Sequence, residues 1–301
     1  MSRLVYVALL MLSLIWGGSF YFIKMLLHDF GPWTIVFLRS SCGLAVVVLI
    51  MLVFKKPFGW RTIPWIPMVI MALINTAIPW SIIGFSETRL SSSMASILNA
   101  TTPIWTVVIG ILFFRQVSNR NQWLGLAIAT IGMIVLLGIT PGSVTSVDLL
   151  GFVCMLSAAC CYGFGSQLSK RLLSKYSMYQ ITFGTLLTSS VSSAIIAFTM
   201  EPISFSHLVA PNNLPMIVGL GVFGSGFAYI LYYFIVQKGS PEFASMVTYL
   251  VPSTALIWGY ALLNEKIEWN MIIGLLIVLA GVFLASKKIR PQQEAHSLKI
   301  R

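Results

Sequence analysis

The sequence contains few charged residues. Asp, Glu, Lys and Arg make up 9% of its 301 residues and only eight residues are acidic, whereas 57% are hydrophobic and the mean hydropathy is +0.90. A chain with so few charges cannot cover itself with a water-soluble surface. Apolar runs of about 20 residues, the length that an α-helix needs to cross a hydrocarbon core of about 30 Å, recur along the whole chain. The composition therefore predicts an all-α integral membrane protein.

The sequence is also poor in the side chains of metal sites and catalytic clusters. Its cysteines all lie inside apolar runs without metal-like or disulfide-like spacing, and its histidines stand singly: Cys42, Cys154, Cys160 and Cys161; His28, His207 and His296. We interpret the cysteines as small packing residues. No histidine cluster, Ser–His pair or pair of carboxylates converges at one membrane interface. We therefore expect no catalytic residue, no metal and no cofactor.

Polar residues, prolines and glycines divide the chain into ten apolar spans, near residues 4–24, 33–53, 64–86, 91–114, 121–138, 148–168, 178–198, 213–236, 241–263 and 270–286. The first span has some features of a signal peptide, but it belongs to the repeat described next, so we interpret it as a membrane helix. No Asp or Glu lies in the middle of a span. The sequence therefore does not support proton coupling through a carboxylate.

The stretch from Ser92 to Leu136 occurs twice. Shifted by 149 positions without a gap, it places nine residues on identical ones: Ala95, Ser96, Pro103, Gly110, Asn121, Gly125, Leu126, Ile128 and Gly132 on Ala244, Ser245, Pro252, Gly259, Asn270, Gly274, Leu275, Ile277 and Gly281. A weaker signal continues upstream, where an offset of 146 pairs Trp16 with Tyr162 and Lys24 with Lys170. One repeat unit therefore contains five spans.

Because five is odd, the second unit must enter the membrane from the opposite side. We therefore predict an all-α fold of ten transmembrane helices arranged as two inverted five-helix repeats. The repeats cover residues 1–139 and 148–286, with a connector at 140–147 and a cytoplasmic tail at 287–301.

Basic residues are unevenly distributed between the predicted loops. With the N-terminus inside, the cytoplasmic segments hold fifteen of the nineteen Lys and Arg residues, and the outer segments hold six of the eight acids. Lys and Arg accumulate in cytoplasmic loops, so we predict a multi-pass protein of the cell membrane with both termini in the cytoplasm. The net charge of +11 then reflects topology, and we expect no nucleic-acid partner. We interpret the basic tail as a solvated end; the alternative is contact with anionic lipid.

The two repeated stretches carry matching polar faces. In the fourth span Ser96, Asn99 and Pro103 share one helical face, and in the ninth span the equivalent face holds Ser245, Thr248 and Pro252. A proline inside a helix removes the hydrogen bond to the carbonyl four residues earlier, which would free the carbonyls of Asn99 and Thr248. We expect these faces to meet at an aqueous pocket near the middle of the membrane. The alternative is local hydrogen bonding in two helices that the prolines only bend.

Further candidate binding residues lie in other spans. The repeat pairs Trp16 with Tyr162 and Trp80 with Tyr229. Aromatic rings with one polar edge suit a pocket for a small amphipathic solute, so we expect these four rings to line it. Asn75 and Ser81 would add polar groups to the same pocket. An arginine inside a span is costly, so Arg39 should face a cavity or a partner, unless it lies near the outer end and snorkels to the headgroups.

Glycines spaced seven apart mark the fifth and tenth spans, at Gly125 and Gly132 and at Gly274 and Gly281. Small residues on one face let helices approach closely in membranes. The spacing predicts close packing of these helices, either as a scaffold or as the contact of a homodimer.

Several features together resemble the EamA family of the drug/metabolite transporter superfamily. They are the five-plus-five inverted repeat, the Trp16-Gly17-Gly18-Ser19-Phe20 opening, Arg39 in Phe37-Leu38-Arg39-Ser40, the two Ala-Ser…Pro blocks and Leu263-Asn264-Glu265-Lys266. The resemblance implies a ten-helix secondary transporter, often an exporter of amino acids or other small metabolites. It also implies a central cavity lined by spans one to four and six to nine. The family usually has Glu at the position of Gln116, so the resemblance gives that position no acidic role.

The sequence thus favours a metabolite exporter that works by alternating access. We expect Asn75, Asn99, Thr248 and the carbonyls freed by Pro103 and Pro252 to bond a small-molecule substrate within the lipid bilayer. A phosphorylated solute would need several cationic side chains, and only Arg39 qualifies, so we favour a neutral, zwitterionic or singly charged solute. The alternatives are an integral-membrane enzyme and a receptor or assembly subunit that does not transport.

Overall fold

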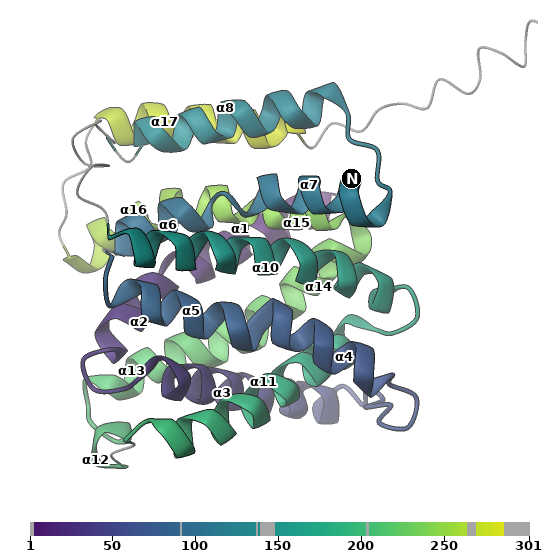
Figure 1. The fold of residues 1–301 in the computed structure, drawn as a ribbon, viewed down its shortest axis with the longest axis vertical. Helices are drawn as coiled ribbons and strands as arrows, with labels where there is room; N and C mark the ends of the chain where they lie inside the picture. Colours follow the sequence, from purple (N-terminus) through teal and green to yellow (C-terminus); the bar gives the residue numbers. More distant parts are fainter. Residues whose placement is uncertain are drawn as a thin grey trace, which may run out of the picture.

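The computed structural model describes residues 3–90, 92–136, 138, 148–202, 205–263 and 269–285, and in this part of the chain the regular structure is helical (Figure 1). Six helical stretches are long and apolar enough to cross a membrane, and they correspond to predicted spans one to three and six to eight: Arg3–Leu26, Pro32–Val53, Trp65–Glu87, Leu149–Leu173, Met178–Met200 and Asn213–Lys238. The protein is therefore an all-helical membrane protein. The predicted connector, the tail and Glu265 lie outside the described residues.

Three of these stretches consist of more than one element. The first combines α1 (Arg3–Gly17) and α2 (Ser19–Leu26), and the third combines α4 (Trp65–Ala72), the π-helix η1 (Leu73–Ala77) and α5 (Ile78–Glu87). The last combines α13 (Asn213–Val218), the π-helix η2 (Gly219–Phe227) and α14 (Ala228–Lys238). The uninterrupted ones are α3 (Pro32–Val53), α10 (Leu149–Leu173) and α11 (Met178–Met200). Segments of π-helix inside α-helices are frequent at functional sites.

The fourth and ninth predicted spans are each divided. The fourth consists of α6 (Ser92–Asn99) and α7 (Thr102–Phe114), so Pro103 lies in the first turn of a new helix, where its missing N–H costs nothing. The ninth consists of α15 (Pro241–Ser245) and α16 (Val247–Leu263), and Pro252 lies inside α16. The expectation of a proline inside one continuous helix is therefore wrong for Pro103 and holds for Pro252.

The fifth and tenth spans, α8 (Arg120–Leu136) and α17 (Trp269–Ala285), pack side by side at the edge of the bundle (Figure 1). A Cβ on Gly125 would lie 2.6 Å from the carbonyl oxygen of Gly281, and a Cβ on Gly274 would lie 2.5 Å from the Cβ of Leu136. The glycine faces thus pack against each other within one chain. This contact already occupies the surface that we expected in a homodimer, so these glycines do not support one.

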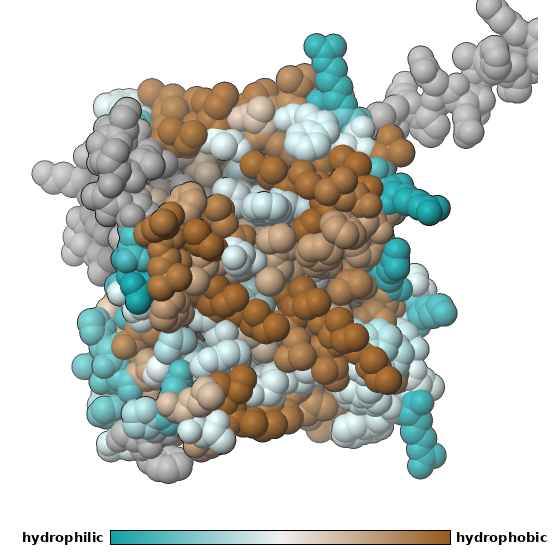
Figure 2. Space-filling model, viewed as in Figure 1, coloured by the Kyte–Doolittle hydropathy of each residue, from teal (hydrophilic) through white to brown (hydrophobic). Residues whose placement is uncertain are grey.

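The surface of the helices is apolar where lipid would lie. Figure 2 shows hydrophobic residues across the middle of the visible face and hydrophilic residues mostly along its left and right edges, where the helices end. Leu49, Phe85 and Ile195 are examples of exposed large apolar side chains. Such a surface fits a bilayer and would be unfavourable in water.

Lysines cover the C-terminal ends of two helices. The Nζ of Lys24 donates to the carbonyls of Glu87 and Leu90, just where α5 ends. The Nζ of Lys170 donates to the carbonyls of Val236, at 2.8 Å, and of Gln237, at 3.2 Å, near the end of α14. The last carbonyls of a helix have no partner inside it and carry partial negative charge, so a cation there stabilises the helix end.

Candidate functional site

The bundle encloses a pocket with about 670 Å³ of empty space, part of it open to solvent. Its wall comes from both halves of the chain and is formed by Trp16, Ser19, Phe20, Ile23, Arg39, Asn75, Trp80, Ile83, Asn99, Thr102, Tyr162, Tyr229, Tyr232, Ser245, Val247, Thr248 and Val251. The wall is mostly aromatic and aliphatic with a few polar groups, which is the usual composition of a small-molecule site.

Arg39 lies on α3 and only 5% of its surface is exposed. Its Nε donates a hydrogen bond to the Oγ of Ser225 at 3.0 Å, and its guanidinium carbon lies 3.7 Å from the centre of the Trp80 ring, as in a cation–π contact. The side chain therefore stays inside the bundle and does not snorkel to the headgroups. Ser225 is held by η2, and its hydroxyl also donates to the carbonyl of Leu220, five residues earlier.

Asn75 lies on η1, and its backbone and side chain both meet the second half of the chain. Pro79 follows four residues later and cannot donate to the Asn75 carbonyl, so that carbonyl needs another donor. The Tyr229 hydroxyl supplies it at 3.2 Å, and the Asn75 side-chain amide donates to the Tyr233 hydroxyl at 3.1 Å. The side-chain oxygen of Asn75 is buried and has no hydrogen-bond partner.

An aromatic cluster forms one wall of the pocket. The Tyr229 ring lies 5.3 Å from that of Trp80 and 6.0 Å from that of Trp16, both in edge-on geometry. The indole N–H of Trp16 donates to the carbonyl of Gly224, in η2, at 3.0 Å. Buried indole and phenol groups need such partners, so these rings are fixed in place around the pocket.

The two divided spans contribute Asn99, Ser245 and Thr248 to the same pocket. The Asn99 carbonyl accepts a hydrogen bond from the Thr102 hydroxyl at 2.6 Å, so the expectation that it is left free is wrong. The hydroxyl of Thr248 donates to the carbonyl of Ser245 at 2.9 Å, which is a local bond of the kind that the alternative interpretation expected. The side-chain oxygen of Asn99 is buried and has no partner.

Three predicted residues are buried but do not line the pocket, namely Ser96, Pro103 and Pro252. Ser81 is buried too, and its hydroxyl donates to the carbonyl of Ile78. Sequence reasoning missed Ser225 and several lining residues, among them Tyr232 and Thr102. Tyr232 follows Tyr229 by three positions on α14, and this helical spacing could have identified it. No pattern in the sequence marks Ser225 as the partner of Arg39.

The described residues contain no group of three His, Cys, Asp or Glu side chains that could hold a metal ion. The described wall of the pocket offers one cation, two amides, several hydroxyls and a large aromatic surface.

A model of the EamA-like transporter family matches residues 3–138 of the chain and, separately, residues 149–287. The chain belongs to this family. This EamA-like protein is thus a membrane transporter. It is similar to proteins that are themselves named transporters. It is 23% identical over 280 residues to the "Uncharacterized transporter YoaV" of Bacillus subtilis (strain 168), covering 93% of this chain and 96% of that one.

Two further matches cover nearly the whole chain. The "Uncharacterized inner membrane transporter YedA" of Escherichia coli (strain K12) is 24% identical over 294 residues, covering 94% of this chain and 92% of that one. A solved structure titled "Crystal structure of protein" superposes with a TM-score of 0.78 at 15% identity, covering 95% of this chain and 97% of the other. At that identity the likeness concerns the fold alone.

Proposed function

We propose that this EamA-like protein is a secondary transporter, in the direction of export, for small neutral, zwitterionic or singly charged metabolites such as amino acids. It would work by alternating access, in which the two halves expose one central pocket first to one side of the membrane and then to the other. The observation that carries the proposal is the composition of the pocket wall. Three repeat pairs meet there: Trp16 with Tyr162, Trp80 with Tyr229, and Asn99 with Thr248.

Contacts elsewhere support the ten-span inverted repeat on which this mechanism depends. Lys24 and Lys170 are a repeat pair, and each donates hydrogen bonds to carbonyls at the end of a helix. Lys24 donates to the carbonyls of residues 87 and 90, and Lys170 to those of residues 236 and 239, which lie 149 positions later. Residues of η1, shifted by 149 positions, fall within η2. Ser41 and Ser190, also 149 positions apart, touch through their hydroxyls at 2.7 Å, as residues near a two-fold axis would.

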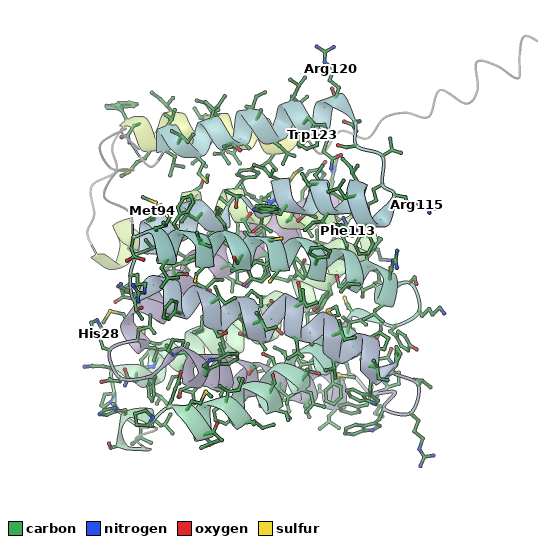
Figure 3. The ribbon with its side chains drawn as sticks, in the orientation of Figure 1. His28, Met94, Phe113, Arg115, Arg120 and Trp123 are labelled. Atoms are coloured by element: carbon green, nitrogen blue, oxygen red, sulfur yellow. The ribbon has the colours of Figure 1, made fainter. Side chains whose placement is uncertain are left out.

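The placement of loop residues supports the proposed orientation. Figure 3 shows His28 and Arg115 at opposite ends of the molecule, and the charge distribution assigns them to the outer and the cytoplasmic side. With Arg115 inside, both termini would be cytoplasmic and the membrane would be the cell membrane. The structure does not describe the C-terminal tail.

The charge of the wall supports the solute class. Arg39 is the one Lys or Arg among the lining residues that the structure describes. A dianionic phosphate needs several charge-assisted hydrogen bonds, which this wall does not provide. The amide, hydroxyl and aromatic groups fit a compact solute with both polar and apolar parts.

A comparison of extracellular metabolites from overexpressing and deleted cells would identify the solute. Its transport is then measured in proteoliposomes with the wild type and with the double variant Asn99→Ala, Thr248→Ala. We expect the double variant to lose most transport, because both side chains face the pocket. The matched control is the double variant Ser157→Ala, Thr199→Ala. Both residues are exposed, and their hydroxyls donate to backbone carbonyls of their own helices. Unaltered transport by the pocket variant would show that the site is elsewhere, and the absence of gradient-driven flux of any solute would favour a receptor or assembly subunit.

A further inference from the structure

The pocket contains a buried cation, Arg39, that forms no ion pair with any residue that the structure describes. Its hydrogen bond to Ser225 uses only Nε. Glu87 is also buried, but it lies beyond ion-pair distance of Arg39. The two terminal nitrogens of the guanidinium therefore have N–H donors without an acceptor among the described residues. A buried charge without a paired opposite charge is costly, so an anionic group of a ligand would stabilise this site.

The guanidinium is held in one orientation. The Trp80 ring stacks against it at 3.7 Å, and Ser225 accepts from Nε at 3.0 Å. A π-helical segment positions each partner, since Trp80 follows η1 closely and Ser225 lies within η2. An arginine fixed in this way presents its planar fork of donors without first losing side-chain freedom, which favours binding of a planar anion.

The pocket wall also carries hydrogen-bond acceptors. The side-chain oxygens of Asn75 and Asn99 are buried acceptors without donors, and both residues line the wall. In the structure both oxygens are covered, and that of Asn75 faces Gly165 on α10. A buried acceptor without a donor costs free energy, so a rotation of either side chain that turned its oxygen to an N–H or O–H group of a ligand would be favourable. The described wall contains no carboxylate that would repel an acid, and Trp16, Tyr229 and Ile83 offer an apolar surface.

We propose that Arg39 anchors a carboxylate, and that the substrates are small monocarboxylates with a hydrogen-bond donor beside the acid group and an apolar side group. α-Amino acids and α-hydroxy acids both have this chemistry. The fork of an arginine matches the two oxygens of a carboxylate, in a charge-assisted pair about twice as strong as neutral hydrogen bonds. The proposal rests on the proposed function, because it assigns the charge of the solute that the same pocket carries.

Four probes share one branched hydrocarbon skeleton and differ in the carboxylate and in the donor beside it: L-leucine, 2-hydroxy-4-methylpentanoate, L-leucinamide and 3-methylbutylamine. Their affinities for the full-length purified protein are measured by isothermal titration calorimetry. We expect both acids to bind, and the amide and the amine to bind at least about tenfold more weakly because they leave Arg39 unpaired. L-Leucinamide binding as tightly as L-leucine, or no binding of either acid, would overturn the proposal.

Variants test the anchor itself. Arg39→Gln should weaken binding of both acids at least about tenfold without changing the affinity for the amide, and Arg39→Lys should fall in between, because an ammonium lacks the planar fork. The matched control is Arg89→Gln, at an exposed arginine that pairs with Asp148 outside the pocket. Arg39→Gln with wild-type affinity for the acids would also overturn the proposal. If Arg39→Gln does not fold, Ser225→Ala, which only frees the guanidinium, must weaken the acids more than the amide.

The two proposals fail in different ways. A transported solute that lacks a carboxylate, and whose transport depends on Asn99 and Thr248, overturns the anchor and leaves the transporter standing. Selective binding of the acids without flux of any solute supports the anchor and contradicts transport.

Discussion

The close approach of α10 and η1 next to the pocket leads to a sharp prediction for Gly165→Ala. A Cβ on Gly165 would lie 2.5 Å from the Cβ of Asn75 and 2.8 Å from its Cα, whereas ordinary contacts begin at 3.4 Å. The Cα belongs to the backbone and cannot rotate away, so the two elements would have to separate. Overpacking of this kind costs about 1–3 kcal/mol, and the higher helix propensity of alanine returns about 0.5–1 kcal/mol. The difference is a net destabilisation of up to about 2.5 kcal/mol.

Thermal unfolding of the purified protein in detergent measures this effect. Gly18→Ala is the control, because a Cβ on Gly18 would meet its neighbours at 3.4 Å or further, in ordinary contact. Gly165→Ala should unfold at a lower temperature than both the wild type and the control, and it should bind the acid probes more weakly because it displaces Asn75. A Gly165→Ala variant as stable as the control would show that α10 and η1 do not lie this close.

Three further changes test other contacts. Lys24→Met and Lys170→Met should each lower the unfolding temperature, by a loss of about 0.3–1 kcal/mol, because each removes the cation from a helix end; stability equal to the wild type would contradict the contacts. Gly125→Leu should separate α8 from α17 and destabilise the monomer, whereas a change in oligomeric state alone, seen by size-exclusion chromatography with light scattering, would favour the dimer. The hydrogen bond from the Gly151 N–H, with Arg89 nearby, lowers the pKa of Asp148 below its ordinary value of 3.8. Asp148→Ala should therefore destabilise the protein at neutral pH. The difference in stability between wild type and variant should shrink as the pH falls through the lowered pKa, because the carboxylate of the wild type is then protonated.

The polar and aromatic positions of the pocket were accessible from the sequence because they occur as repeat pairs. Trp80 and Tyr229 are 149 positions apart, and so are Asn99 and Thr248, and all four line the pocket. A pair that recurs at one offset marks equivalent places in two similar halves, so its members can meet where the halves meet. The rule is not complete, because the single residues Arg39 and Asn75 also line the pocket, whereas the repeated Ser96, Pro103 and Pro252 do not.

The backbone of the divided spans was not predictable in the same way. A proline shows which carbonyl loses its donor, but not which group replaces the donor. At Asn99 the replacement is the hydroxyl of Thr102, and at Asn75 it is the hydroxyl of Tyr229, 154 residues away. The first is a local choice between competing hydrogen bonds and the second depends on tertiary packing, so apolar periodicity indicates neither.

The environment of Arg39 shows the same limit. Its position within an apolar span indicated that it needs a partner, but the sequence left snorkelling open as an alternative. The partner Ser225 is placed by η2, a segment whose π-helical geometry leaves no periodic mark in the sequence.

The central claim is that one pocket is exposed to the two sides of the membrane in turn, and a single cysteine in the pocket tests it most directly. Val251→Cys, which lies in the pocket wall without a proposed role in binding, is introduced after Cys42, Cys154, Cys160 and Cys161 have been replaced by serine. A membrane-impermeant thiol reagent is then applied to right-side-out and to inside-out vesicles. Alternating access predicts labelling at this position from both sides, reduced in both cases by a saturating concentration of the transported solute. Labelling from one side only, or labelling that the solute does not reduce, would contradict the account.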